Sequence, residues 1–238
     1  FNCHSQSTYM IIPAENNEQD GQVILIDKPL NWTSFDVVKK LRFALQVKKI
    51  GHAGTLDPLA TGLLILCTGK MTKSIERFQA QEKEYTGEIT IGAVTASYDL
   101  ESEPESFKDF SHITLSDCQQ AAATFKGEIS QTPPIFSAVK KDGKRAYELA
   151  RAGKEVILKS KQVTISAFEI TDFTPPKLSF RIQCSKGTYI RSIANDFGKF
   201  LAVGGYLSSL RRTKIGQYSV TDASELTTFV DTHKVEKA

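Results

Sequence analysis

The chain has 238 residues, of which 40% are apolar and 24% charged, with a formal net charge of +3. These proportions are typical of a globular protein and exclude collagen-like and disordered classes. The longest aliphatic run, Leu63–Leu66, is far shorter than the roughly 20 residues of a membrane span, so no membrane association is expected. Residues 1–20 lack the apolar core and basic start of a secretory signal, and we expect them to form a flexible leader.

Charge is distributed unevenly along the sequence. Residues 39–49 include five basic residues and no acidic residue. Residues 139–161 include eight basic and three acidic residues, and residues 177–217 include eight basic residues and one acidic residue. Residues 99–117 are the opposite, with six acids and one lysine. If the basic segments share one face, that face suits a polyanionic partner. Charge scattered over the whole surface is the alternative that composition alone leaves open.

The four cysteines, at positions 3, 67, 118 and 184, are far apart and form no C-x-x-C pair. This spacing argues against a disulfide scaffold or a zinc knuckle and favours a reducing, cytoplasmic compartment. His52 and Asp57 have no third partner at a recognisable ligand spacing. We therefore expect no metal site.

Hydrophobic periodicity predicts interspersed strands and helices. The expected strands are 22–26, 63–67, 85–91, 155–173, 178–185, 207–213 and 217–221. The expected helices are 35–46, 70–79, 117–126, 144–151, 188–201 and 223–230, the first capped by Ser34 and the third opened by a capping box at Ser116. Because no regular βαβ repeat is present, we expect an α+β fold, with a single catalytic-sized domain over residues 21–238.

The most informative segment is the glycine-rich loop from Lys49 to Gly62. It places one imidazole, His52, and one carboxylate, Asp57, in a frame that permits close approach of a ligand. A phosphate-binding loop is excluded, because six residues rather than four separate Gly62 from Gly69 and no Ser or Thr follows the next lysine. A loop aspartate is most often a cap or turn residue, so the residues alone leave the role of Asp57 open.

The run GHAGTLDPLATG at residues 51–62 resembles the signature of the TruB class of pseudouridine synthases. Further matches follow in the family's order at 27–29 with 33–34, 83–85, 131–134 with 137–140 and 143–145, 184–191, and 210–212. Together they span about residues 21–217. The resemblance implies a pseudouridine synthase fold, with a central, largely antiparallel or mixed sheet, flanking helices and a catalytic cleft.

The resemblance also implies a reaction and a partner. A uridine in the T loop of tRNA, at position 55, would lose its C1′–N1 bond, turn over, and form a C1′–C5 bond to give pseudouridine. No cofactor or metal is needed for this chemistry. The expected partner is the T stem-loop of tRNA, and the expected state of the enzyme is a cytoplasmic monomer.

Residue by residue, the resemblance assigns the chemistry to three side chains. Asp57 matches the catalytic aspartate, Tyr85 the aromatic that stacks on the flipped uracil and assists removal of the C5 proton, and Arg191 the arginine that pairs with the aspartate. Four more residues match substrate-pocket positions. His52 matches the histidine that fills the space vacated by the flipped base, Tyr189 and Leu210 match residues that line the pocket, and Lys28 matches a structural lysine near the site.

Physical chemistry is consistent with these assignments. Extrusion of a base costs a few kcal/mol, and stacking on an aromatic ring such as Tyr85 recovers about 1–3 kcal/mol. A dry site raises the pKa of a carboxyl group, and a nearby guanidinium opposes that shift. Arg191 follows Ile190 on the expected helix and lies about 100° from its apolar stripe, so we expect it at the rim of the core.

Two departures from the family pattern stand out. Asn31 occupies a turn position where many members have glycine, and about 20 residues follow Gln217, which leaves no room for the PUA domain that many members carry. Two other functions stay open: a non-catalytic RNA-binding protein on the same scaffold, and an isomerase with another RNA target. The sequence also leaves open whether Asp57 attacks the sugar, attacks the base or abstracts a sugar proton.

Overall fold

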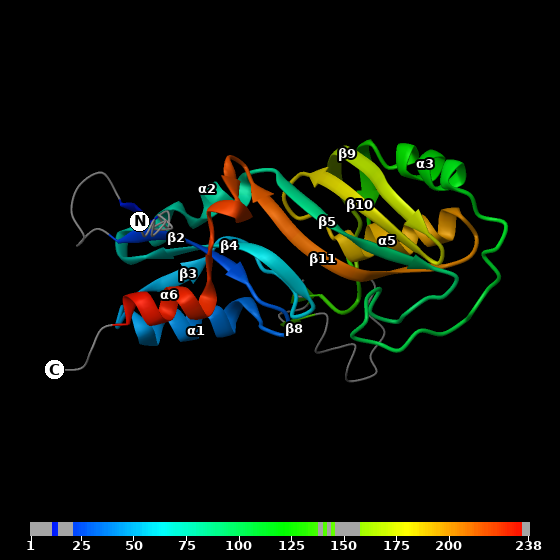
Figure 1. Cartoon of the computed structure of the whole chain (residues 1–238). Coiled ribbons are helices and arrows are strands. Elements are labelled where there is room, and N and C mark those ends of the chain that lie inside the picture. Colours follow the sequence, from blue (N-terminus) through cyan, green and yellow to red (C-terminus); the bar gives the residue numbers. More distant parts are fainter. Residues whose placement is uncertain (1–10, 14–20, 138–139, 142–143, 146–157, 235–238) are drawn as a thin grey trace, which may run out of the picture. The chain divides into compact units, whose positions relative to one another are not determined.

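The structure is a computed structural model that describes residues 11–13, 21–137, 140–141, 144–145 and 158–234 (Figure 1). The chain divides into two compact units, Phe1–Lys83 with Arg211–Ala238, and Glu84–Leu210. Two strands, β5 (Lys83–Ile91) and β11 (Gly205–Ile215), contain the points where the chain passes between the units. Within the described ranges, no helix has the length and apolar character needed to cross a membrane.

In the first unit, a sheet has the strand order β1-β2-β4-β11. Its members are β1 (Ile11–Pro13), β2 (Gln22–Lys28), β4 (Ala60–Thr68) and the end of β11. The short strands β3 (Ile50–His52), β12 (Tyr218–Ser219) and β13 (Ser224–Glu225) pair with β4, β11 and β2, respectively. The pairing of β13 with β2 is parallel, whereas β3 with β4, β2 with β4 and β12 with β11 are antiparallel.

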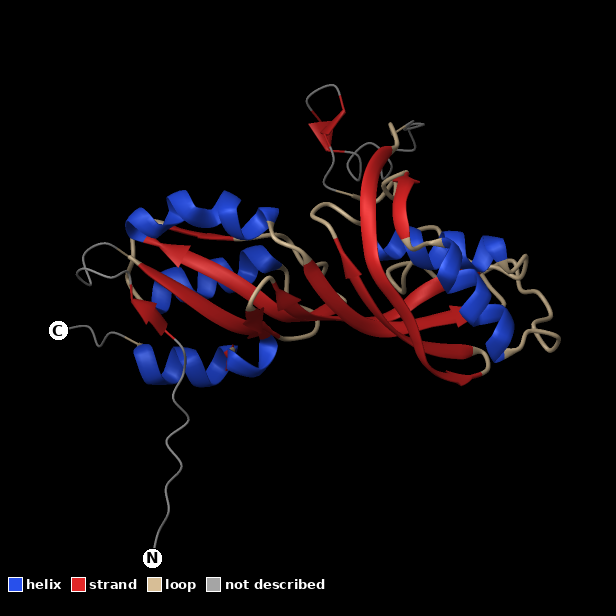
Figure 2. Cartoon of the chain, turned by 90° about the horizontal axis from the view of Figure 1, so that it is seen from above, coloured by secondary structure: helices blue, strands red, loops and turns tan. Residues whose placement is uncertain are grey.

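The central strands of this sheet are apolar almost throughout because both faces are covered. On one face, Ile24 and Leu66 pack against Leu41 of α1 (Ser34–Ala44) and Phe229 of α6 (Leu226–His233). On the other face, the alternate residues pack against α2 (Ile75–Ala80), which follows the 3-10 helix η2 (Gly69–Ser74). Figures 1 and 2 show helices on both sides of this sheet.

In the second unit, the strand order is β11-β5-β10-β9-β6, with β6 (Gly127–Gln131), β9 (Lys161–Thr174) and β10 (Lys177–Cys184). α3 (Leu115–Thr124) packs on β9 and on α5 (Ile190–Phe200). Phe168 lies at the centre of an aromatic cluster, with its ring 5.7 Å from that of Phe197 and 6.2 Å from that of Phe180. A separate two-stranded sheet pairs β7 (Lys140–Lys141) with β8 (Lys144–Arg145).

The predicted α+β fold is confirmed, and the strands at 22–26, 63–67, 85–91 and 178–185 form with small shifts at their ends. The alternation in β10 is also confirmed, since its apolar residues are buried and the intervening ones are more exposed. Within the predicted leader, residues 11–13 form β1, and its other residues lie outside the described ranges.

Both predicted helix caps are wrong by one or two residues. The N-cap of α1 is Thr33, whose side chain accepts a hydrogen bond from the Asp36 amide, while the Asp36 carboxylate accepts one from the Thr33 amide. Thr114 and Asp117 form the same box at the start of α3. A capping box needs the acid three residues after the cap, and Thr–x–x–Asp meets that spacing in both places.

Other predicted bounds also need correction. Residues 144–145 form a strand, so no helix begins there, and residues 146–151 of that predicted helix lie outside the described ranges. β9 begins at residue 161 rather than 155, because residues 158–160 have no regular structure and residues 155–157 are not described. The segment 70–79 divides into η2 and α2. Near the C-terminus, strand pairing at 218–219 and 224–225 shortens the predicted strand 217–221 and delays the last helix to 226.

Candidate active site

The loop that carries Asp57 is fastened to the start of α1. The Ser34 hydroxyl accepts a hydrogen bond from the Leu56 amide at 2.9 Å and donates one to the Leu56 carbonyl at 3.2 Å. On the other side of Asp57, the Pro58 carbonyl accepts from the Asn31 amide at 2.9 Å. The partly exposed Asp57 therefore lies between two anchored residues.

The Asn31 departure is compatible with this arrangement. Asn31 has φ of 64°, which is the left-handed region that favours glycine. Asparagine is among the non-glycine residues that enter this region most readily. Asn31 thus adopts a backbone conformation that glycine favours, and its amide reaches the Pro58 carbonyl.

The side chain of Arg212 also holds this loop, through hydrogen bonds to its backbone. Its side chain is buried, with 1% exposed, and its guanidinium donates to the Leu63 carbonyl at 2.8 Å, the Gly54 carbonyl at 3.1 Å and the Thr55 carbonyl at 3.5 Å. Gly54 has φ of 95°, so the backbone there bends in a way that few other residues allow. Arg212 lies in one of the family matches of the sequence, at 210–212, but the local pattern there indicates no role for it.

Lys28 is a second buried cation beside the loop. It is fully buried, and its ammonium donates to the carbonyls of Pro29, Trp32 and Pro58. Burial lowers the pKa of Lys28, the charge of Asp57 opposes this shift, and the nearby guanidinium of Arg212 adds to it, so that the pKa is about 8. The attraction between Lys28 and Asp57 favours the ionised form of each group.

His52 is the last residue of β3 and is half-buried. Burial lowers its pKa, the Gly54 backbone opposes that shift, and the charge of Arg212 lowers the pKa further. Its Nδ1 atom is buried without a well-formed hydrogen bond to the described groups. The ring is therefore neutral near pH 7.

In the second unit, Tyr85 lies on β5 next to a polar ladder. Glu84 accepts hydrogen bonds from Arg181 at 2.7 Å and from Gln183 at 3.0 Å, and Arg181 also binds both carboxylate oxygens of Glu169. Successive side chains on a strand point to opposite faces. The ladder therefore anchors β5 from the face opposite to Tyr85, which is 8% exposed.

Arg191 is more deeply placed than predicted. It is the second residue of α5 and is 5% exposed, not at the rim of the core. Its Nε lies 3.6 Å from a carboxylate oxygen of Asp99, and its Nη1 donates to the carbonyls of Phe136 at 3.1 Å and Ser97 at 3.3 Å. These partners supply the charge and the acceptors that a buried guanidinium requires. Its pairing with Asp57 stays a prediction.

Tyr189 and Leu210 belong to the second unit as well. The backbone of Tyr189, just before α5, exchanges two hydrogen bonds with the Gln131 amide group, at 2.8 and 3.1 Å. The Lys161 ammonium lies 4.8 Å from the centre of the Tyr189 ring. Leu210 is half-buried on β11. Gln131 was part of a sequence match without a role, and only the structure reveals that it positions Tyr189.

The predicted site residues therefore form two groups, each held within its own unit. The first contains Asp57, Lys28 and His52, with Arg212 added by the structure. The second contains Tyr85, Arg191, Tyr189 and Leu210. Among the residues with described positions, no three His, Cys, Asp or Glu side chains gather closely enough to hold a metal ion.

Comparison with known proteins extends the resemblance found in the sequence. Residues 42–190 match the family described as TruB family pseudouridylate synthase (N terminal domain). The chain is 55% identical to tRNA pseudouridine synthase B of Flavobacterium johnsoniae, a match that covers 88% of this chain and 95% of that protein. It is 52% identical to tRNA pseudouridine synthase B of Chloroherpeton thalassium, with 89% and 90% covered.

Solved structures show the same fold. A chain of a Cbf5-Nop10-Gar1 complex superposes with a TM-score of 0.69 and 28% identity, over 90% of this chain and 54% of that chain. A chain of an H/ACA RNP bound to a substrate RNA containing 2′-deoxyuridine gives a TM-score of 0.67 and 26% identity, and the match covers 90% of this chain and 53% of that chain. The present chain thus spans about half the length of these two solved chains.

Proposed function

Because this chain belongs to the TruB family of pseudouridylate synthases, we propose that it converts the uridine at position 55, in the T loop of tRNA, into pseudouridine. The names of its relatives support tRNA as the substrate. The observation that carries the proposal within this chain is the anchored Asp57 loop, which the buried Arg212 holds by its backbone and where the buried Lys28 interacts electrostatically with the carboxylate.

The reaction rearranges bonds without a change in composition. The C1′–N1 bond breaks, the uracil turns, and a C1′–C5 bond forms. The C5 position loses a proton and N1 gains one, so no oxidant or reductant is consumed. We propose that the chain needs no cofactor, because an ionised carboxylate, a positioned base and a route for one proton suffice.

Asp57 is the proposed reacting carboxylate. Its loop is held by Ser34, Asn31 and Arg212, so the side chain is presented without a costly rearrangement. Lys28 favours its ionised form. The three routes, attack on the sugar, attack on the base and abstraction of a sugar proton, all require that ionised form.

Four side chains are proposed to receive the flipped nucleotide. Tyr85 stacks on the uracil, and Tyr189 and Leu210 line the pocket around it. His52, which is neutral near pH 7, fills the space that the base leaves in the T loop. Stacking worth about 1–3 kcal/mol offsets much of the few kcal/mol that extrusion costs.

Arg191 is the proposed partner of Asp57. Its guanidinium is fixed by Asp99 and by the carbonyls of Phe136 and Ser97, so its orientation is set before the substrate binds. A planar guanidinium in a fixed orientation can hold a carboxylate by two parallel hydrogen bonds.

We also propose that residues 21–238 act as a single catalytic domain and that the protein is a cytoplasmic monomer. The partner that this requires is the T stem-loop of tRNA. Cys67, Cys118 and Cys184 are buried and form no disulfide with one another, which is compatible with a reducing compartment. Sedimentation velocity tests the monomeric state.

The test of the reaction is the Asp57→Asn variant. Asparagine keeps the size of the side chain but removes its charge and basicity, so tRNA binding should be retained while conversion falls more than 100-fold, an increase in barrier of over about 2.7 kcal/mol. The measurement is single-turnover tritium release from C5-labelled uridine in an unmodified tRNA transcript. Asp222→Asn, at an exposed site in the same unit, is the matched control and should react like the parent.

The outcomes separate the rival functions. A folded Asp57→Asn protein that reacts within a factor of about 100 of the parent would show that Asp57 is not essential. A parent protein that binds tRNA and converts no uridine would identify a non-catalytic RNA-binding protein. Mapping of the modified position distinguishes the T loop from another RNA target.

A further inference from the structure

One face of α1 carries features that the fold does not require. Val37, Val38 and Leu41 already supply the contacts that hold the helix on the sheet. Phe35 and Phe43 point elsewhere, with 66% and 72% of their surface exposed. The exposed side of a helix in a globular protein is normally polar, and clustered exposed aromatics mark interaction surfaces.

Basic side chains surround these two aromatics. Lys39, Lys40 and Arg42 are all exposed, and Lys39 is spaced four residues from each phenylalanine, so the three form a line along the helix. We define the α1 face by these five residues. The acidic residue on α1, Asp36, accepts hydrogen bonds from the amide and the hydroxyl of Thr33 as part of the N-terminal cap. The α1 face is therefore aromatic and cationic together.

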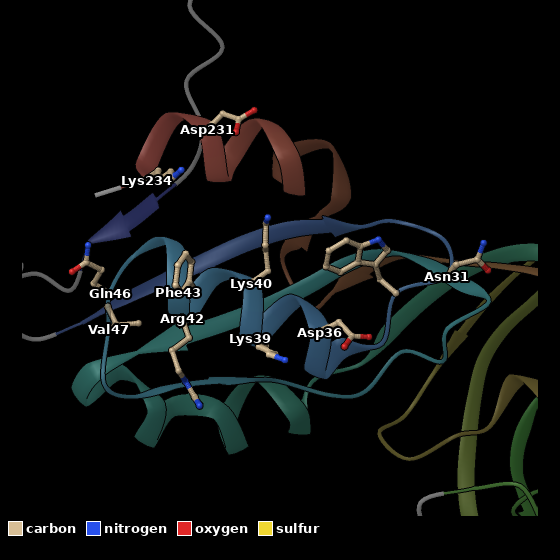
Figure 3. A pocket seen from close by; sticks show the side chains of 11 residues that line it. Asn31, Asp36, Lys39, Lys40, Arg42, Phe43, Gln46, Val47, Asp231 and Lys234 are labelled. Carbon is tan, nitrogen blue, oxygen red and sulfur yellow. The ribbon is translucent and has the colours of Figure 1, made fainter. Parts of the chain in front are cut away.

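A groove runs beside this face. It has a volume of about 1470 Å³, and Figure 3 shows that α1 and α6 both contribute to it, with Lys40 and Phe43 extending from α1 toward the α6 side and Arg42 extending away from it. Its lining contains four cations and two acids: Lys39, Lys40, Arg42, Lys234, Asp36 and Asp231. The surplus of positive charge continues into Lys48 and Lys49, which are exposed.

The α1 face begins at the candidate active site. Ser34, the first residue of α1, is bonded to Leu56, and the turn before it is bonded to Pro58. An 11-residue helix extends about 16 Å. A polymer with one nucleotide at Asp57 thus has a cationic surface next to it, long enough for several of its phosphates.

We propose that the α1 face binds the sugar–phosphate backbone of the substrate RNA beyond the nucleotide that reacts. Lys39, Lys40 and Arg42 contact phosphates, and the two phenylalanines pack against exposed ribose or base faces. This inference rests on the proposed function, since it takes the occupant to be tRNA. A second copy of the chain fits poorly, because a two-fold contact through this face would bring like charges together.

Two double variants test the ionic and the aromatic parts. Lys39→Gln with Lys40→Gln should weaken binding of an unmodified tRNA transcript about tenfold and should reduce the slope of log Kd against log salt concentration by about 1.5–2. Phe35→Ser with Phe43→Ser should also weaken binding about tenfold and leave the slope unchanged, since stacking is not ionic. Both should keep the parent rate of conversion at saturating tRNA.

The control is Lys108→Gln with Lys126→Gln, which removes two exposed lysines outside the three basic segments and should match the parent. If both α1 variants bind tRNA with the parent affinity and slope, the inference is wrong while the proposed function stands. Sedimentation of the parent as a dimer that Phe35→Ser with Phe43→Ser dissociates would assign the face to self-association and overturn the inference. If the parent converts no uridine in tRNA, the proposed function fails, and the inference fails with it.

Discussion

Arg211 and Arg212 are neighbours on β11 with the same side chain and different surroundings. The Arg211 side chain is 41% exposed and pairs with Asp27 through contacts of 3.0 and 2.6 Å. Arg212 is buried and donates to backbone carbonyls of the Asp57 loop. Replacing each by methionine therefore separates the effect of a surface ion pair from that of a buried clamp.

The expected magnitudes follow from these contacts. A hydrogen bond from a charged donor contributes about 1.5–3 kcal/mol, so the two short bonds of Arg212 to the Leu63 and Gly54 carbonyls contribute about 3–6 kcal/mol. The cost of burying the guanidinium offsets part of this. We expect Arg212→Met to lower the free energy of unfolding by about 3 kcal/mol. An exposed pair is worth no more than about 1 kcal/mol, which bounds the effect of Arg211→Met.

Urea unfolding followed by circular dichroism measures both values. The conversion rate of each folded variant, measured below its unfolding transition, reports on the loop. Arg212→Met should react at least tenfold more slowly than Arg211→Met, because the Gly54 carbonyl loses its anchor, and Arg212→Lys should recover part of the loss. A stability difference between the two methionine variants below about 1 kcal/mol would refute the conclusion that Arg212 holds the loop.

Two further predictions concern other buried cations. The folded chain releases the Lys28 proton near pH 8, whereas the unfolded chain keeps it until about pH 10.5. Between these two pH values the unfolded state therefore binds one more proton than the folded state, and the free energy of unfolding rises with pH. Relative to Lys28→Met, the parent should gain about 3 kcal/mol of unfolding free energy over this range. Urea titrations of both proteins across this range would contradict the burial of Lys28 if their difference stayed constant. Arg191→Lys keeps the charge and loses the planar fork, so it should bind tRNA almost normally and react at least tenfold more slowly in single turnover; a rate equal to the parent's would exclude the pairing with Asp57.

Local patterns in the sequence were sufficient for much of the fold. The uninterrupted apolar runs of β2 and β4 and the alternation in β10 identify strands, because burial on two faces or on one dictates those patterns directly. The glycines around Asp57 likewise mark a loop that a ligand can approach. The predicted helix caps were wrong because more than one neighbouring hydroxyl could cap each helix. At α1, the Ser34 hydroxyl is bonded to Leu56 of the Asp57 loop, and the Thr33 hydroxyl caps the helix instead.

The anchors of the candidate site depend on residues far apart in the sequence. Gly54 and Arg212 are separated by 158 positions, and no local period relates them. A strand pattern tells that Arg211 and Arg212 point to opposite faces, but it does not tell which one is buried. That choice follows from the packing of β11 against the Asp57 loop, where three backbone carbonyls converge on one guanidinium. The sequence by itself determined the central strands and the glycine-rich loop that carries Asp57, and tertiary packing decided which charges are buried to hold that loop in place.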